Sequence, residues 1–264
     1  MWNIYKRLWL VNWAEQWQYR ANLLMYLAFW LVSPIIFLAI WTTVASAQGS
    51  VNGLTAQDFV AYYMMLLIVD IATSEITIHI FAYRIQDGTL SNQLVLPIHP
   101  MLTQVLVNNL AFKALQMCAL VPIWALLYLL YHPVIILTPV NLLLAVPVLA
   151  LSFTMQFFAG AAITCIAFWT TRIWAIMDLY YAAFRLFAGQ FVPLALLPAA
   201  MQNLSQVLPF RLMLYFPVQL LLGKVSLQET LSSMALQVVW CALGFLLFRL
   251  IWHVGVRKFS AVGA

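Results

Sequence analysis

Residues 84–100, RIQDGTLSNQLVLPIHP, form a long polar interruption between two apolar runs of the chain. Asp87-Gly88 is a turn pair, because glycine adopts a positive φ without steric cost. After this pair, Thr89 or Ser91 can cap a short helix by accepting a backbone N–H bond at its start. The stretch therefore predicts a compact, capped element rather than a loose loop.

The predicted short helix has one apolar face. Leu90 and Leu94 share that face, because residues four apart are neighbours on a helix. Pro97 ends the helix, since the residue before a proline is pushed out of the α region. A rigid helix with an apolar face and a polar rim, held between two membrane spans, predicts a docking element for another protein. We place this element within residues 84–101.

The composition predicts a protein that is solvated mainly by lipid. The chain has 264 residues, of which 66% are hydrophobic and only 7% are charged, whereas soluble domains are about 25% charged. Several apolar runs are long enough to cross a hydrocarbon core about 30 Å thick. The formal charge of +5 is spread thinly, which indicates a topology signal rather than a nucleic-acid-binding patch. We therefore expect a single all-α polytopic membrane domain over residues 1–264.

The cysteines and the absence of ligand clusters argue against a metal centre. Cys118, Cys165 and Cys241 lie at scattered positions inside apolar runs, which is not the spacing of a disulfide framework or a zinc site. We expect them to be small core residues, and we expect neither catalytic residues nor a metal site in this chain.

The N-terminal residues 1–21 predict a helix that lies in the membrane interface. Tyr5, Trp9, Trp13 and Trp17 recur every four residues and form one aromatic stripe, while cations occupy much of the remaining surface. Such a helix places its rings toward the hydrocarbon and its cations at the lipid phosphates. We call it the elbow helix.

Six spans are expected after the elbow helix. They cover roughly residues 22–45, 59–83, 102–130, 134–169, 174–197 and 231–252. Between the last two, residues 190–224 contain four prolines that divide an apolar sequence into pieces too short to span. Broken helix at membrane depth is tolerated where it is buried in protein or lines a wet cavity. This segment therefore predicts a re-entrant or extracytoplasmic helix pair before the sixth span.

The distribution of basic residues predicts that both termini are cytoplasmic. With that orientation, the inner segments hold seven Lys and Arg residues and the outer segments hold two, in agreement with the positive-inside rule. Lys113, Arg185 and Arg249 are assigned to spans. The docking element within residues 84–101 then faces the cytoplasm.

Charged residues inside the predicted spans are candidates for function. Each charged residue at a span centre costs about 2.5–3.5 kcal/mol, so these residues normally face the bundle interior or water. Asp70 and Glu75 are five residues apart, about 140° around a helix, and should not share a face. Three roles stay open: structural pairs that fix helix packing, a polar lining of a substrate path, or a proton relay. The candidates are Asp70, Glu75, His79, Asp178, Tyr181 and Arg185, with Glu75 and His79 four residues apart and able to pair.

The order of these features resembles the ABC type-2 permease family. The resemblance covers essentially the whole chain and is carried by IQDGTLSNQLVLPIHP after the second span and FAGQFVPLALLPAAMQNLSQVLPF before the last. It is closest to bacterial permeases, which implies a multi-pass protein of the bacterial inner membrane. It also implies that residues 84–101 are a cytoplasmic coupling helix, which contacts a separate ATPase subunit through Arg84, Asp87, Gly88, Leu90, Ser91, Leu94 and Pro97.

The resemblance further implies that the chain is the non-catalytic subunit of an exporter. ATP and Mg²⁺ would bind to the partner subunit, and this chain indeed lacks a G-x-x-x-x-G-K-[ST] phosphate loop. A second copy or a related permease would complete the substrate path, which would carry a lipid-like molecule, an amphiphile, a peptide or a drug outward.

Two other functions agree less well with the sequence. A lipid-modifying membrane enzyme would gather acidic residues for Mg²⁺ near one interface, but the acidic residues here are spread over different depths. A secondary carrier would show paired broken helices in both halves, and only the second half is broken.

Overall fold

The computed structural model describes residues 2–75, 78–96, 99–101, 106–135 and 137–259, and these residues are helical apart from turns, links and one isolated bridge. The helices are α1 (Trp2–Gln18), α2 (Arg20–Gln48), α3 (Ala56–Thr73), α4 (Ile78–Gln86), α5 (Ser91–Leu94), α6 (Leu106–Tyr131), α7 (Pro139–Thr164), the 3-10 turn η2 (Cys165–Phe168), α8 (Ile173–Phe187), the 3-10 turn η3 (Leu194–Leu196), α9 (Ala199–Val207), α10 (Phe210–Met213), α11 (Tyr215–Leu221) and α12 (Leu227–Lys258). The all-α class is therefore confirmed.

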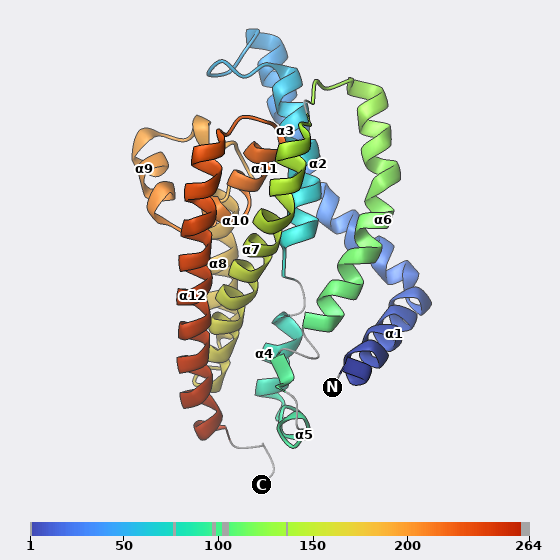
Figure 1. The fold of residues 1–264 in the computed structure, drawn as a ribbon, viewed down its shortest axis with the longest axis vertical. Coiled ribbons are helices and arrows are strands. Elements are labelled where there is room, and N and C mark those ends of the chain that lie inside the picture. The colour runs from blue at the N-terminus through green and yellow to red at the C-terminus, as the bar shows by residue number, and fades with distance from the viewer. Residues whose placement is uncertain (1, 76–77, 97–98, 102–105, 136, 260–264) are drawn as a thin grey trace.

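Five helices of the described residues are long and apolar enough to cross a membrane: Leu24–Gln48, Ala56–Thr73, Asn109–Tyr131, Pro139–Phe168 and Leu227–Lys258. They form a bundle with α4 and α5 at one end. The start of α1 and the end of α12 lie at that same end (Figure 1). The depth of α1 relative to the bilayer stays a prediction, as does the membrane orientation.

The second predicted span is not one continuous helix. α3 ends at Thr73, and Ser74 and Glu75 are non-helical before α4 starts at Ile78. A buried ammonium contributes to this break, because Lys113 Nζ of α6 donates a hydrogen bond to the Ile71 carbonyl at 2.7 Å. The expected single span over 59–83 is therefore wrong in its continuity, because the described residues form two helices, α3 and α4.

The fifth predicted span is shorter than expected. α8 has 15 residues, about 22 Å of helix, against a hydrocarbon core about 30 Å thick. It ends because Gly189 adopts a φ of +83° and because donors from α2 and α3 bind the chain that follows. The Tyr62 hydroxyl donates to the Gly189 carbonyl at 2.7 Å, and the Tyr63 hydroxyl and Trp41 Nε1 both donate to the Phe191 carbonyl.

The proline-rich segment is divided into short pieces, as its sequence predicts. Within residues 190–224 the chain forms η3, α9, α10 and α11, of which α9 is the longest with nine residues. A hydrogen-bonded ion pair joins this segment to α3, since Lys224 Nζ lies 3.0 Å from Asp58 Oδ1. Its position in the membrane stays a prediction.

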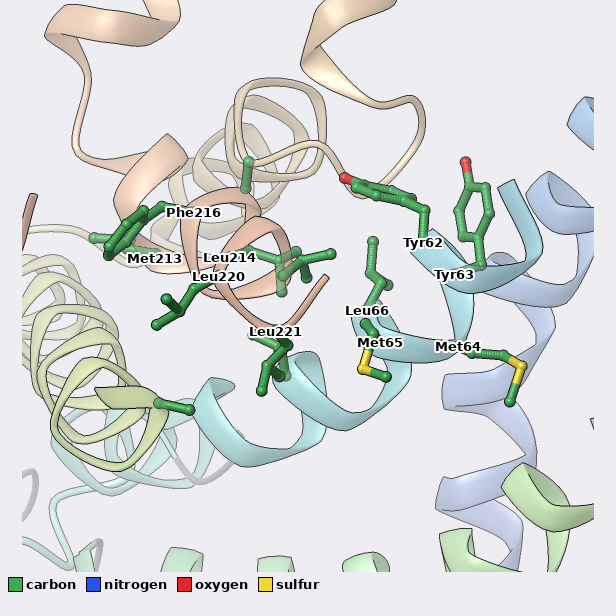
Figure 2. Packing of buried hydrophobic residues seen from close by; sticks show 14 of the residues in the cluster. Tyr62, Tyr63, Met64, Met65, Leu66, Met213, Leu214, Phe216, Leu220 and Leu221 are labelled. Carbon is green, nitrogen blue, oxygen red and sulfur yellow. The ribbon is translucent and has the colours of Figure 1, made fainter. Parts of the chain in front are cut away.

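Helix α3 is the centre of the largest hydrophobic core. Its residues Phe59–Leu67 are buried on every side, and Figure 2 shows Met65 and Leu66 facing Leu214 and Leu221 of the broken segment while Met64 points away toward another helix. A second core lies at the other end of the bundle and joins α4 and Leu90 to α7, η2, α8 and α12. The segment after α4 is thus packed into the body of the protein.

Candidate functional site

The turn after α4 is held by its own side chains. Asp87 Oδ1 accepts hydrogen bonds from the Thr89 backbone N–H at 2.9 Å and the Thr89 hydroxyl at 2.7 Å. The Ser91 hydroxyl donates to the Gly88 carbonyl at 2.8 Å. The prediction that Thr89 or Ser91 caps the short helix is wrong, because both hydroxyls act as donors and α5 has no side-chain cap. Asp87 stabilises the turn instead, as aspartate does when it accepts from the backbone two residues on.

The predicted common face of Leu90 and Leu94 is divided between the core and the surface. Gly88 has a φ of +82°, and the reversed chain bonds the Leu90 N–H to the Arg84 carbonyl at 3.0 Å. Leu90 therefore packs in the second core and is 0% exposed. The outer surface of the turn is formed by Leu94, Val95 and Leu96, all exposed.

The remaining predicted contact residues differ in their exposure. Asp87 is exposed, Arg84 is half-buried and Gly88 is buried, while Pro97 lies outside the described residues. Ser91 is half-buried, and Thr89 and Asn92 are exposed beside Asp87 and Leu94–Leu96. We call Asp87 together with the apolar surface of Leu94–Leu96 the tip.

Two contacts fix the tip region to the bundle. Gln86 Nε2 donates to the Thr171 carbonyl, in the loop before α8, at 3.1 Å. The ring of His99 lies 4.7 Å from that of Trp252 and 5.9 Å from that of Phe248, centroid to centroid. Burial in this aromatic site lowers the pKa of His99 below its ordinary value, which favours the neutral ring.

A polar cavity of about 540 Å³ is lined by residues of α2, α3, α4, α7 and α8. All six residues predicted as an intramembrane polar network line this cavity: Asp70, Glu75, His79, Asp178, Tyr181 and Arg185. The expectation that Asp70 and Glu75 face apart is wrong, because it assumed an unbroken helix. The break after Thr73 takes Glu75 out of the helical register and brings both carboxylates to one cavity.

Asp70 has structural partners on two other segments. It is 1% exposed, and its Oδ2 accepts hydrogen bonds from Trp30 Nε1 of α2 at 2.8 Å and from Gln190 Nε2 at 3.0 Å. These bonds join α2, α3 and the turn after α8 at one point.

The break between α3 and α4 is surrounded by polar groups from α6. Asn109 Nδ2 donates to Glu75 Oε1 at 2.7 Å. Lys113 Nζ lies 2.7 Å from the Ile71 carbonyl and 3.3 Å from Ser74 Oγ, and the carboxylates of Glu75 and Asp70 attract its charge. A buried ammonium is thereby compensated by two carboxylates and by a carbonyl at a helix end, which is what burial of a charge requires.

The cavity face of α8 differs from this buried network, because its charges are exposed. Asp178 and Arg185 are both exposed and both line the cavity. Between them, Tyr181 packs against the ring of His79, whose other neighbour is Trp174 at 5.9 Å between centroids. The predicted pairing of Glu75 with His79 through helical spacing does not apply, since the helix is broken between them.

Sequence reasoning missed several residues of this site. Lys113 was assigned to a span without a role, although a lysine within the apolar run 106–131 was a signal that could have been followed. Trp30, Asn109 and Gln190 gave no signal, because only the fold brings them to the two carboxylates. Among the residues that the structure describes, no group of three His, Cys, Asp or Glu side chains could hold a metal ion.

The five span-length helices define a multi-pass membrane protein. The family model described as "ABC-2 family transporter protein" matches residues 20–263, so the chain belongs to this family and is a transmembrane permease of an ABC transporter. Such permeases are typically non-catalytic and act with an ABC ATPase. The family thus favours the permease over the secondary carrier and the lipid-modifying enzyme. Comparison with curated proteins and with solved structures gives no match.

Proposed function

We propose that this chain is one of the two permeases of an ATP-driven exporter of the bacterial inner membrane, with both termini in the cytoplasm. A separate ATPase subunit, which holds ATP and Mg²⁺, contacts the tip, and a second copy or a related permease completes the substrate path. The distribution of Lys and Arg supports this orientation, because it leaves the tip among the positively charged inner segments.

The observation that carries the proposal is the position of α4. This nine-residue helix begins beside the polar cavity, where His79 is part of the lining, and it ends at the turn that presents the tip. Figure 1 shows α4 and α5 below α3 and not continuous with it. Displacement of the tip by the ATPase is thus transmitted to the cavity through one short rigid element, as in movements of domains about a hinge. The non-helical Ser74 and Glu75 supply that hinge.

The exposed charges of α8 support a path shared by two permeases. Facing hydrocarbon, Asp178 and Arg185 would each cost about 2.5–3.5 kcal/mol near the centre of a membrane. A second permease and water in front of this face remove that cost. Two copies with the same orientation are related by a rotation axis along the membrane normal. Asp178 of one copy therefore lies at the same depth in the membrane as Asp178 of the other copy. Like charges at one depth favour a hydrated path over a dry contact.

The lining of the cavity suggests an amphiphilic substrate. It combines acidic and basic side chains with the aromatic rings of Trp30, Tyr181 and Phe191, so that it offers partners both to a charged group and to an apolar one. We therefore place lipid-like molecules, peptides and amphiphilic drugs within the substrate range.

The docking role is tested with Leu94→Asp/Val95→Asp in the permease co-expressed with its ATPase. Val95 is 83% exposed, so the variant should fold while losing the apolar contact. We expect the ATPase to be lost from purified complexes. Val134→Asp is the matched control: this valine is 71% exposed and lies in the α6–α7 loop at the opposite end of the bundle. Retention of a coupled ATPase by the double variant would disprove docking at the tip, and equal loss in both variants would show that the effect is unspecific.

A further inference from the structure

A wholly apolar cleft separates α6 from α7. Its volume is about 790 Å³, and its walls come from residues 117–129 of α6 and 142–149 of α7, with Met65 and Ile68 of α3 at the back. Figure 1 shows the upper half of α6 standing apart from α7, and α6 packs mainly on α1 and α3. The cleft is therefore a gap between two consecutive membrane-spanning helices.

The length of the cleft matches one leaflet of a bilayer. The lining of α6 extends from Met117 to Leu129. These positions are about 18 Å apart along a helix, which is slightly more than half of a hydrocarbon core about 30 Å thick. The cleft lies in the half of α6 that leads to the α6–α7 loop. The length of the cleft thus fits an extended apolar molecule that starts at one membrane surface and ends near the bilayer centre.

The surface end of the cleft carries the side chains expected beside lipid headgroups. There Tyr128 lines the cleft and stacks on Trp124 at 5.8 Å between ring centroids, and His132 lies edge-on to Tyr128 at 6.5 Å. The indole N–H of Trp124 is turned inward, since it donates to the Met64 carbonyl at 3.3 Å. Amphipathic aromatic rings of this kind are enriched at the level of the headgroups. The apolar walls accordingly end where a polar headgroup would begin.

We propose that the acyl chain of a membrane phospholipid occupies this cleft, with its headgroup beside Tyr128 and His132. A transmembrane helix of a partner would extend along the whole hydrocarbon core of about 30 Å, whereas the cleft extends along only about 18 Å of α6. Lipid tails are as apolar as leucine, so the hydrophobic effect does not drive this binding. Van der Waals contact drives the binding instead. The side chains that line an empty gap have no neighbouring atoms on one side, and a fitted acyl chain restores the dispersion energy of those contacts.

The test uses the protein in nanodiscs containing a phosphatidylethanolamine with a diazirine midway along one acyl chain. Photolabelled peptides are mapped by mass spectrometry. We expect labelling of residues 117–129 and 142–149 to exceed several-fold that of the outward face of α12 around Leu246 and Leu250, which are both exposed and line neither this cleft nor the apolar pocket between α7 and α12. The tail then has a site and is not merely part of the surrounding lipid.

Two substitutions fill the cleft from opposite walls. Ala125→Trp in α6 and Val146→Trp in α7 both change exposed lining residues, and each should reduce the labelling several-fold. Leu143→Trp is the matched control, because Leu143 is 74% exposed on α7 but does not line the cleft. Equal labelling of the cleft and of α12, unchanged labelling in both filled variants, or crosslinks from the cleft to another protein chain would each overturn the proposal. The result does not depend on docking at the tip, so the two hypotheses can fail separately.

Discussion

Gly189 ends α8 at a position that no other residue can occupy without strain. Its φ is +83°, and a Cβ added there would lie 2.7 Å from the Tyr62 hydroxyl oxygen and 3.0 Å from Tyr215 Cδ2. The same Tyr62 hydroxyl donates to the Gly189 carbonyl. Backbone conformation and close approach therefore both require glycine where the last cavity-lining helix meets the broken segment.

Gly189→Ala should lower the free energy of unfolding by more than the backbone cost of about 1–3 kcal/mol. Gly53→Ala separates the cost of a positive φ from the cost of the steric contact, because Gly53 has a φ of +80° but open space around the added Cβ. We expect thermal unfolding in detergent to show a larger decrease in Tm for Gly189→Ala than for Gly53→Ala. Equal decreases would mean that the contact with Tyr62 has no energetic weight.

His99 makes the packing of the tip region sensitive to pH. Its pKa is lowered in the folded protein by burial against Phe248 and Trp252, so the unfolded chain binds the proton more tightly. The stability that this site contributes is complete above the ordinary histidine pKa of about 6.5 and is lost as the pH falls below that value.

His99→Phe keeps an aromatic ring at this site and removes the proton. We expect the wild-type protein to lose more Tm than His99→Phe between about pH 7.5 and about pH 5.5, while the two proteins behave alike in the upper part of this range. Parallel losses in both proteins would place the titration on other groups.

The hydrophobic pattern was sufficient to locate most helices but not their interruptions. Apolar runs predict α2, α6, α7 and α12 within a few residues, because span length is set by the bilayer. The end of α3 was missed, since it depends on Lys113, 42 positions away from the carbonyl that it binds. Leu90 shows the same limit in a short element: spacing put it on the face of Leu94, whereas the turn at Gly88 directs it into the core.

Removal of the Lys113 ammonium tests whether it holds the break between α3 and α4. Lys113→Met leaves the Ile71 carbonyl without this donor and removes one of the positive charges that attract the buried Glu75 and Asp70 carboxylates. Leaving buried polar groups unsatisfied costs about 1–3 kcal/mol each, and the two carboxylates lose a nearby positive charge, so we expect a clear decrease in the stability measured by denaturant or heat.

Glu75→Gln in the Lys113→Met background should recover part of that loss, since it removes the uncompensated charge. Gln116→Met is the matched control on the same helix: Gln116 is also buried, it carries no charge, and its Oε1 has no hydrogen-bond partner among the described residues. A Gln116 variant as unstable as Lys113→Met, or a double variant without recovery, would contradict a role for charge compensation.

In the whole molecule, polar residues that the sequence scatters over three segments line a single cavity. Rarity was the useful signal, because a charged side chain in an apolar run is costly unless the fold gives it partners or water. The rarity of charged residues in apolar runs could not tell a buried, hydrogen-bonded charge from an exposed one. Asp70 is buried and hydrogen-bonded by Trp30 and Gln190, whereas Asp178 and Arg185 are exposed.

The exposed pair on α8 makes the arrangement of two copies testable. Asp178 and Arg185 are seven residues apart, about 10 Å along the helix, and a two-fold axis along the membrane normal preserves that difference in depth. In a background with Cys118, Cys165 and Cys241 replaced by Ala, a bismaleimide shorter than about 10 Å should link two copies of Asp178→Cys and, separately, two copies of Arg185→Cys. It should not link Asp178→Cys in one copy to Arg185→Cys in the other.

Leu250→Cys on the outward face of α12 is the control and should give no dimer, because Leu250 is 66% exposed and that face should remain in lipid. If the α8 cysteines also react with a membrane-impermeant maleimide, water reaches the face between the copies, as like charges at one depth require. Links between unlike positions, or dimers through Leu250→Cys alone, would instead put another face at the centre of the transporter. The charges of α8 would then need a partner from within the broken segment or the ATPase complex rather than from a second permease.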